Sequence, residues 1–315
     1  MSPILTNGSL DPPDEFYSMD IQLLAMRFYD YSLFIRGYSK PTIARYKNII
    51  DLYCKSSGNT QIEQVNKRNV REFFYYGRTQ RNWQNGTYIC SHKSLGVFFE
   101  WCKSEGYLAE NPIRDVEVPK LEKRLPVKLT KQEALKLLEV SYNYPYGIKL
   151  LRYRNHAIFS TFIFAGLRKK ELINLKLTDV DLENMTLLVR QGKGSKDRII
   201  PISFTLAQTL KRYLLERKQA NKTCPDFFTS SGLNRGLTES GLKKYVDTIR
   251  KSSKIKFTIH KLRHTFATLM LEGGCDIYSL SRMMGHSDIK TTTIYLNASA
   301  EHLRSQISKH PLNDL

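Results

Sequence analysis

Apolar side chains recur every three or four residues along most of the chain, which is the spacing of amphipathic helices. From Ser18 to Gly37 this pattern places one apolar stripe on a helix, at Ile21, Leu24, Phe28, Tyr31 and Ile35. Three similar segments follow, with stripes at Ile43, Tyr46, Ile50 and Tyr53, a helical pattern over 66–80, and a stripe at Cys90, Ser94, Val97, Phe98 and Trp101. We therefore expect a compact unit of four helices over residues 18–110.

The second of these helices has clear signals at both ends. Ser39 precedes it as a cap, Pro41 suits its first turn, and Gly58 ends it. Residues 1–17, which contain three prolines and small polar side chains, are expected to form a disordered arm.

Residues 111–129 carry no apolar period. They contain Pro112, Pro119 and Pro126 among many charged side chains, and this composition predicts an extended linker. A basic linker between two basic domains would suit a clamp that closes around a duplex. An ordinary exposed connector explains the same composition equally well.

Helical spacing returns after the linker. Thr130 and Glu133 form a capping box ahead of a helix through Val140. A strongly apolar helix follows and ends near Gly166, with Ile158, Phe162, Ile163 and Phe164 expected to be buried. A short helix then brings Arg168 and Glu171, three residues apart, onto one face.

The pattern next changes from a period of three to four to a period of two. Leu187 and Val189 on one side, and Ile200 and Ile202 on the other, flank a glycine-rich turn and predict a β-hairpin. The turn is not a phosphate-binding Walker loop, because no glycine stands five residues before Gly192. Helices resume over 205–220, 237–253 and from Thr258 onward, so the fold class is mainly α with a small β-hairpin.

Composition adds a partner to this picture. The 315 residues include 49 Lys and Arg against 30 Asp and Glu, a formal net charge of +19, and the sequence pI is about 9.6. Such a charge favours association with a polyanion, most simply nucleic acid. The five cysteines form no CxxC pair, and no apolar stretch or signal peptide indicates export or a membrane span. We expect a cytoplasmic protein that does not bind membranes.

Ionisable side chains gather between Thr258 and Asn297. His260 and Arg263 lie three residues apart on a predicted helix, so both can reach one phosphate. His260 and His264 have metal-ligand spacing, but Lys261 stands where a zinc-protease helix requires glutamate. No GxSxG motif lies near these histidines, which argues against a serine nucleophile.

Five motifs in this order resemble those of the tyrosine recombinases of the Xer and phage-integrase type. They are AGLRKKEL, GKGSKDR, HKLRH, a GH dipeptide and TTTIY. The segments GYSKPTIARYKNII and SLGVFFEWCKSEGYLAENPIRDVEVPK also resemble the core-binding helices and linker of that family. The resemblance covers about residues 19–310 and implies a two-domain, C-shaped clamp, with the core-binding domain at 18–110 and the catalytic domain at 130–297.

The resemblance also implies an active site. Its catalytic residues would be Arg168, Lys193, His260, Arg263, His286 and the nucleophile Tyr295, supported by Glu171 and His264. Lys196 competes with Lys193 as the acid that protonates the leaving oxygen. His260 could accept the tyrosine proton. No metal or other cofactor is required, because the arginines would neutralise the phosphate.

A free tyrosine has a pKa near 10, so only about 0.1% is ionised at pH 7, a deficit of about 4 kcal/mol. We expect the neighbouring cations to reduce that deficit for Tyr295. DNA contacts outside the site are expected from basic side chains of both domains, namely Lys40, Arg45, Lys47, Arg81, Lys93, Lys243 and Lys244. Solvated surface charge is the competing interpretation of each of them.

The resemblance further implies a homo-oligomer, a dimer on one recombination site and a tetramer when two sites synapse, associated with the nucleoid. Residues 298–315 would form a tail helix, with Ala298, Leu303 and Ile307 on its apolar side, that docks on its own or a neighbouring subunit. Two alternatives remain: a nicking-closing enzyme like the type IB topoisomerases, and a DNA-binding protein without catalysis. The biological roles open to such an enzyme are those of an integrase, a resolvase, a transposase and a chromosome-dimer recombinase.

Overall fold

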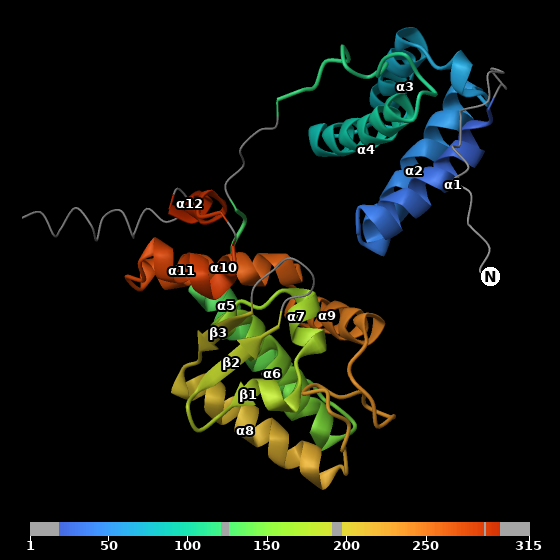
Figure 1. Cartoon of the computed structure of the whole chain (residues 1–315). Coiled ribbons are helices and arrows are strands. Elements are labelled where there is room, and N and C mark those ends of the chain that lie inside the picture. The colour runs from blue at the N-terminus through green and yellow to red at the C-terminus, as the bar shows by residue number, and fades with distance from the viewer. Residues whose placement is uncertain (1–18, 121–125, 191–196, 287, 297–315) are drawn as a thin grey trace, which may run out of the picture. The chain divides into compact units, whose positions relative to one another are not determined.

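The computed structural model describes residues 19–120, 126–190, 197–286 and 288–296. The chain divides into two compact units, residues 1–123 and 124–315 (Figure 1). Both units are mainly helical, and the second contains a small antiparallel sheet, which confirms the expected fold class. The finer domain boundaries and the clamp stay predictions.

The described part of the first unit is a four-helix bundle, as predicted. Its helices are α1 (Ile21–Asp30), α2 (Lys40–Ser57), α3 (Lys67–Thr79) and α4 (Asn85–Ser104). Pro41 lies in the first turn of α2, and Gly58 ends that helix in a left-handed conformation with φ of 70°. Aromatic rings dominate the core, with Phe28, Tyr53 and Phe98 almost fully buried.

The stripe predicted for the first helix is wrong at its end. Residues Tyr31–Ile35 form a π-helix rather than a continuation of α1. A π turn holds more residues than an α turn, so the following side chains rotate away from the spacing of three and four. Ser32 is consequently buried, whereas Ile35, which was placed on the apolar stripe, is 74% exposed.

Two further stripe positions are also wrong. Val97 of α4 is 38% exposed, because Leu95, Phe98 and Phe99 form the face that meets the core. Phe164 is 36% exposed although most of its helix, α6 (Lys149–Ala165), is buried. Apolar spacing therefore predicts which face of a helix is buried, but not which residues lie at the edges of that face.

The predicted linker is partly packed. Ile113 and Val116 are buried in the core of the first unit, and the Tyr88 hydroxyl donates to the carbonyl of Glu117 at 2.9 Å. At the other end, Leu129 is fully buried in the core of the second unit. The prediction of an exposed, extended connector is therefore wrong for both ends of 111–129, because single apolar side chains anchor a segment without any periodic pattern.

The second unit begins with α5 (Lys131–Asn143), whose predicted capping box between Thr130 and Glu133 is confirmed. Its other helices are α6 (Lys149–Ala165), α7 (Lys169–Asn174), α8 (Phe204–Gln219), α9 (Glu239–Ser253), α10 (Ile259–Glu272), α11 (Ile277–Met284) and α12 (Lys290–Leu296). Gly166 ends α6 with φ of 62°, and a Cβ there would lie 2.2 Å from a ring carbon of Phe266. Only glycine fits this junction, which leads directly into the predicted site.

The predicted hairpin is confirmed as strands β2 (Thr186–Val189) and β3 (Arg198–Pro201), with Leu187 opposite Ile200. Leu187, Val189 and Ile200 are buried on one face. A two-residue strand, β1 (Val180–Asp181), pairs with β2 and was too short to predict. The tip of the hairpin, with Lys193 and Lys196, lies outside the described residues, as does the predicted tail 298–315.

Helices α10, α11 and α12 lie together at one edge of the second unit (Figure 1). They share a small apolar cluster separate from the main core, formed by Phe266, Ala267, Leu271, Leu280, Met284 and Tyr295. Within the described ranges, no helix has the length and apolar character needed to cross a membrane.

Candidate active site

A pocket of about 550 Å³ opens in the second unit. Its lining consists of Leu167, Arg168, Lys169, Ile259, His260, Arg263, His264, His286, Thr291, Ile294 and Tyr295. Five of the six predicted catalytic residues therefore lie around one cavity, although they come from four separate helices or their flanking loops. The sixth, Lys193, lies outside the part of the chain that the structure describes.

Helix α10 supplies four of the lining residues, Ile259, His260, Arg263 and His264. Thr258 caps its start by accepting a hydrogen bond from the backbone of Lys261, which fixes where the first turn begins. Leu262 and Phe266 are buried on one side of the helix. His260 and His264 consequently lie one turn apart, with ring centroids separated by 4.2 Å.

Arg263 is the most deeply held cation of the pocket, with only 3% of the residue exposed. Its guanidinium donates to the carbonyl of Gly166 at 2.6 Å and to the carbonyl of Met284, and it lies 3.3 Å from His286 Nε2. Burial, and then the charge of Arg168, lower its pKa to about 10, so it remains protonated at neutral pH. The pocket therefore keeps a permanent positive charge.

Arg168 is the N-cap residue of α7, not a member of its helical turn. Its Nη1 donates to Glu171 Oε1 at 2.7 Å, and its Nη2 donates to the carbonyl of Gly285 at 2.8 Å. The side chain is 40% exposed, so the guanidinium is accessible from the pocket. The predicted pairing of Arg168 with Glu171 is present.

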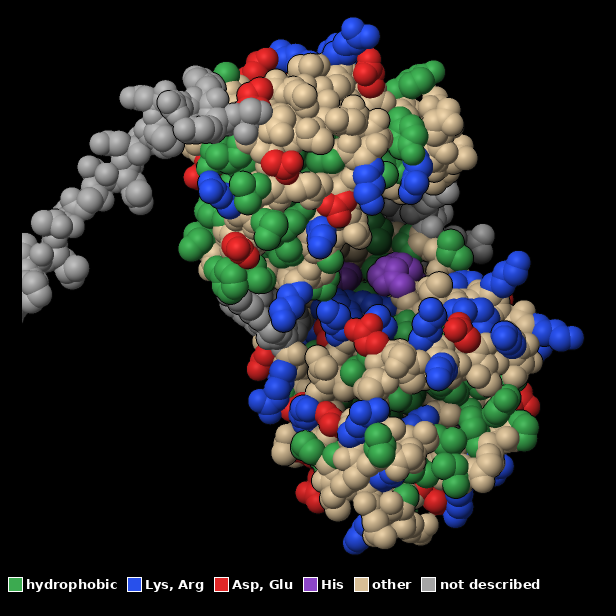
Figure 2. All heavy atoms as spheres, turned by 90° about the vertical axis from the view of Figure 1, so that its right-hand side faces the viewer, with side chains coloured by type: hydrophobic (Ala, Val, Ile, Leu, Met, Phe, Trp, Pro, Cys, Tyr) green, Lys and Arg blue, Asp and Glu red, His purple; other side chains and the backbone are tan. Residues whose placement is uncertain are grey.

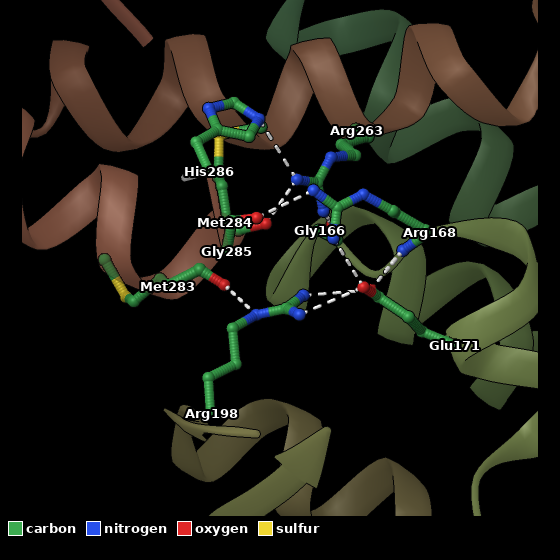
Figure 3. Close-up of polar contacts among 9 residues, drawn as sticks. All are labelled: Gly166, Arg168, Glu171, Arg198, Arg263, Met283, Met284, Gly285 and His286. Carbon is green, nitrogen blue, oxygen red and sulfur yellow. Dashed lines mark hydrogen bonds and ion pairs between the residues drawn. The ribbon is translucent and has the colours of Figure 1, made fainter. Parts of the chain in front are cut away.

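A third arginine, Arg198 at the start of β3, joins this group (Figure 3). It binds both oxygens of Glu171, at 3.0 and 2.9 Å, and its side chain is only 8% exposed. Burial raises the pKa of Glu171, but Arg198 and Arg168 outweigh that effect and hold it at about 2. Arg198 was not among the predicted site residues, although it is the last residue of the motif GKGSKDR and stands directly before the apolar pair Ile199 and Ile200.

Tyr295 contacts a histidine rather than the arginines. Its hydroxyl lies 2.8 Å from His264 Nδ1, and the residue is 2% exposed within the apolar cluster of α10–α12. Burial raises the pKa of the Tyr295 hydroxyl, and the charges of Arg263 and Arg168 offset this only in part. The cations therefore lower the pKa of the Tyr295 hydroxyl as expected, but desolvation of the phenolate exceeds this attraction, so the net deficit is not reduced.

The histidines of the pocket are neutral at pH 7. Burial, and then nearby positive charge, lower the pKa values of His264 and His286 to about 4, and the pKa of His260 is lowered for the same reasons. His286 Nδ1 lies 2.8 Å from the Thr292 hydroxyl. Because Arg263 can only donate, His286 Nε2 acts as the acceptor in their contact.

The basic side chains predicted to bind DNA are all exposed, namely Lys40, Arg45, Lys47, Arg81, Lys93, Lys243 and Lys244. On the surface of the second unit, histidine side chains lie beside clustered lysine and arginine side chains (Figure 2). Among the described residues, no group of three or more His, Cys, Asp or Glu side chains could hold a metal ion. Together, the arginines and Tyr295 make the pocket a cationic site with a buried phenol at its edge.

Two family models match the chain. The model described as "Phage integrase family" matches residues 128–302, and the model described as "Phage integrase, N-terminal SAM-like domain" matches residues 24–107. The first match contains every residue of the pocket, and the second contains most of the helical bundle.

Curated relatives match nearly the whole chain. The tyrosine recombinase XerA of Thermococcus onnurineus is 33% identical over 288 residues, which cover 89% of this chain and 93% of the relative. The tyrosine recombinase XerD of Listeria monocytogenes is 32% identical over 289 residues, 88% of this chain and 94% of the relative.

Solved structures share the fold. The XerH site-specific recombinase bound to palindromic difH substrate superposes with a TM-score of 0.75 at 20% identity, covering 94% of this chain and 98% of that one. A lambda integrase dimer bound to a COC' core site gives a TM-score of 0.70 at 19% identity, covering 88% and 77% of the two chains.

Proposed function

This chain belongs to the phage integrase family of tyrosine recombinases, and we propose that it cleaves and rejoins DNA at specific sites through a phosphotyrosine intermediate. The observation that carries the proposal is the single pocket that gathers Arg168, His260, Arg263, His286 and Tyr295. The partner is double-stranded DNA, in keeping with the net charge of +19.

The scissile phosphate would sit between the two arginines of the pocket. Guanidinium groups stay charged and can donate paired hydrogen bonds to non-bridging oxygens, so they stabilise the negative charge that builds up in the transition state. Arg168 is the more accessible of the two, whereas Arg263 is almost fully enclosed. We infer that Arg168 makes the first contact with DNA and that Arg263 sets the charge deeper in the pocket.

Tyr295 would attack the phosphorus in line. A bond forms between its oxygen and the phosphorus while the bond to the 5′ oxygen breaks, which leaves a 3′-phosphotyrosine and a free 5′-hydroxyl. Lys193 gives a proton to the departing 5′ oxygen, with Lys196 as the alternative donor. The reverse reaction with a 5′-hydroxyl from another strand completes the exchange, so no external energy source is needed.

A histidine would accept the phenol proton. The motif suggested His260 as this acceptor. However, His264 Nδ1 lies 2.8 Å from the Tyr295 hydroxyl, and the His260 ring packs against the His264 ring with 4.2 Å between the ring centroids. A neutral imidazole with a free nitrogen is the acceptor that this step needs. We therefore assign the first proton transfer to His264, with His260 as a contact of the phosphate or of His264.

The remaining features follow from the family and stay proposals. They are a dimer on each site, a tetramer joining two sites, docking of the tail 298–315, a clamp formed with residues 18–110, metal independence, and a cytoplasmic location at the nucleoid. The basic side chains Lys40, Arg45, Lys47, Arg81, Lys93, Lys243 and Lys244 would contact the DNA backbone.

The test is a search for covalent protein–DNA adducts. Sheared genomic DNA from the source organism is incubated with the protein in EDTA, and fragments that survive SDS are recovered with the protein and sequenced. We expect enrichment of a short sequence with the wild type and with the control Tyr278→Phe, whose side chain is exposed on α11, and none with Tyr295→Phe.

The other outcomes identify the alternatives. No adduct from the wild type, with fragments still bound, would indicate a DNA-binding protein without catalysis. Adducts without sequence preference, together with relaxation of supercoiled plasmid by a monomer, would indicate a topoisomerase. Adducts that vanish in EDTA would contradict metal-independent cleavage.

A further inference from the structure

The Arg198 side chain is almost fully buried, and three of its nitrogen atoms donate hydrogen bonds within the protein. Nε donates to the carbonyl of Met283 at 2.7 Å, while Nη1 and Nη2 donate to the two oxygens of Glu171 at 3.0 and 2.9 Å. A bidentate arginine–carboxylate pair fixes direction as well as distance. Arg198 therefore defines where the carboxylate of Glu171 lies.

Glu171 in turn accepts hydrogen bonds from Arg168 and so orients it. Its Oε1 also accepts from Arg168 Nη1, and its Oε2 accepts from the Arg168 backbone N–H, both at 2.7 Å. Each carboxylate oxygen is thus shared between the two arginines. The orientation of the Arg168 guanidinium, which faces the pocket, consequently depends on the Glu171 carboxylate, and Arg198 fixes the position of that carboxylate.

Arg168, Arg198 and Arg263 all bind the C-terminal end of α11 (Figure 3). Arg198 binds the carbonyl of Met283, Arg263 that of Met284, and Arg168 that of Gly285. Carbonyls at a helix C-terminus lack partners within the helix and attract cations. Three successive carbonyls are therefore bound by side chains from β3, α10 and α7, directly before His286.

We propose that Arg198 is a positioning residue of this active site: it orients Arg168 through Glu171 and fixes the C-terminal end of α11, and thereby the place of His286. This role rests on the proposed function, since it concerns the same phosphate pocket. Arg198 does not line the pocket, so it contributes to the rate of cleavage without contacting DNA.

An ordinary stabilising ion pair is the competing explanation. Arg198→Lys separates the two, because lysine keeps the charge but cannot make the three directed hydrogen bonds. Arg190→Lys is the matched control. Arg190 lies on the other side of the same hairpin, pairs with Asp179 at 2.7 Å and is 59% exposed.

The first measurement is single-turnover cleavage of a nicked duplex that carries the enriched genomic sequence. We expect Arg198→Lys to lower the rate constant by about 10- to 100-fold, as is usual for groups that orient a catalytic residue. The dissociation constant for DNA and the fraction of molecules that react should stay as in the wild type. Arg190→Lys should change the rate by less than about fivefold, because Arg190 neither lines the pocket nor contacts Glu171 or the end of α11.

The second measurement needs no DNA. Histidine side-chain NMR of the full chain should show a shifted His286 resonance in Arg198→Lys and an unchanged one in Arg190→Lys. An unchanged His286 signal would overturn the proposal whether or not the protein cleaves DNA. A smaller reactive fraction with a normal rate constant would also overturn it, since that result describes lost folding rather than lost orientation. If the wild type forms no adduct, the proposed function fails and the NMR comparison still decides the role of Arg198.

Discussion

The pocket is built from two parts that are held in different ways. The arginine cluster, formed by Arg168, Arg198 and Arg263 with Glu171, is fixed by short hydrogen bonds to carbonyls and to a carboxylate. The tyrosine–histidine pair, Tyr295 and His264, is joined by one hydrogen bond. Tyr295 otherwise packs in the small apolar cluster of α10–α12.

This difference indicates that the arginine cluster and the tyrosine–histidine pair have different roles in the proposed reaction. Charge-assisted hydrogen bonds with defined directions would keep the proposed phosphate-binding groups in place before DNA binds, which is the condition for electrostatic catalysis. Tyr295 lines the pocket but is only 2% exposed, so we expect its phenol to become more exposed before it attacks a phosphate. We therefore expect the arginine cluster to be rigid and the tyrosine–histidine pair to be the part that rearranges.

The largest effect should come from breaking the arginine cluster at Arg263. Arg263→Lys loses the fork that reaches both Gly166 and Met284. We expect the single-turnover cleavage rate to fall by about 10²- to 10³-fold, the usual loss for a donor that stabilises transition-state charge. Arg250→Lys serves as the control, because Arg250 also donates to a carbonyl, that of Phe257, but does not line the pocket. Equal rates for the two variants would refute a special role for the cluster.

A smaller but clear loss should follow from breaking the tyrosine–histidine pair. His264→Leu removes the acceptor next to the Tyr295 hydroxyl, and we expect cleavage to slow by about 10²-fold, the lower range for general base catalysis. His264→Asn keeps a hydrogen-bond acceptor but no basic nitrogen. If proton uptake matters, both variants are slow; if His264 only holds the tyrosine, the asparagine variant retains the wild-type rate.

The smallest effect concerns pH and stability. His264 and His286 have pKa values of about 4 in the folded protein, against about 6.5 when unfolded, because of burial and nearby cations. Between pH 6.5 and 4 the unfolded chain binds more protons, so stability falls as the pH falls through this window.

For these half-exposed rings, after discounting for solvent screening, we expect a loss on the order of 1–2 kcal/mol in total. Urea unfolding at pH 7, 6 and 5 measures it, and His264→Asn should reduce the slope. A pH-independent free energy of unfolding would contradict the neutral state of both rings in the folded protein.

Periodic patterns predicted the elements of the fold but not the edges of their buried faces. The four helices of the first unit, the capping box at Thr130 and the hairpin follow from local spacing and are present in the structure. Ile35 was placed on the apolar stripe of the first helix and is exposed, because a π turn cannot be recognised from apolar spacing. Leu129 and Ile113 were assigned to a linker and are buried, because one side chain can anchor a segment without a pattern.

The sequence by itself determined which chemical groups the protein carries: the arginines, histidines and tyrosine are fixed by identity, and their order along the chain indicates the family. Only the tertiary structure decided how they meet. Arg198 joins the site through Glu171, and Tyr295 lies against His264 rather than His260. These contacts link residues 27 and 31 positions apart in the chain. Local spacing determines a helix or a strand, but contacts at such separations depend on how the packed elements bring them together.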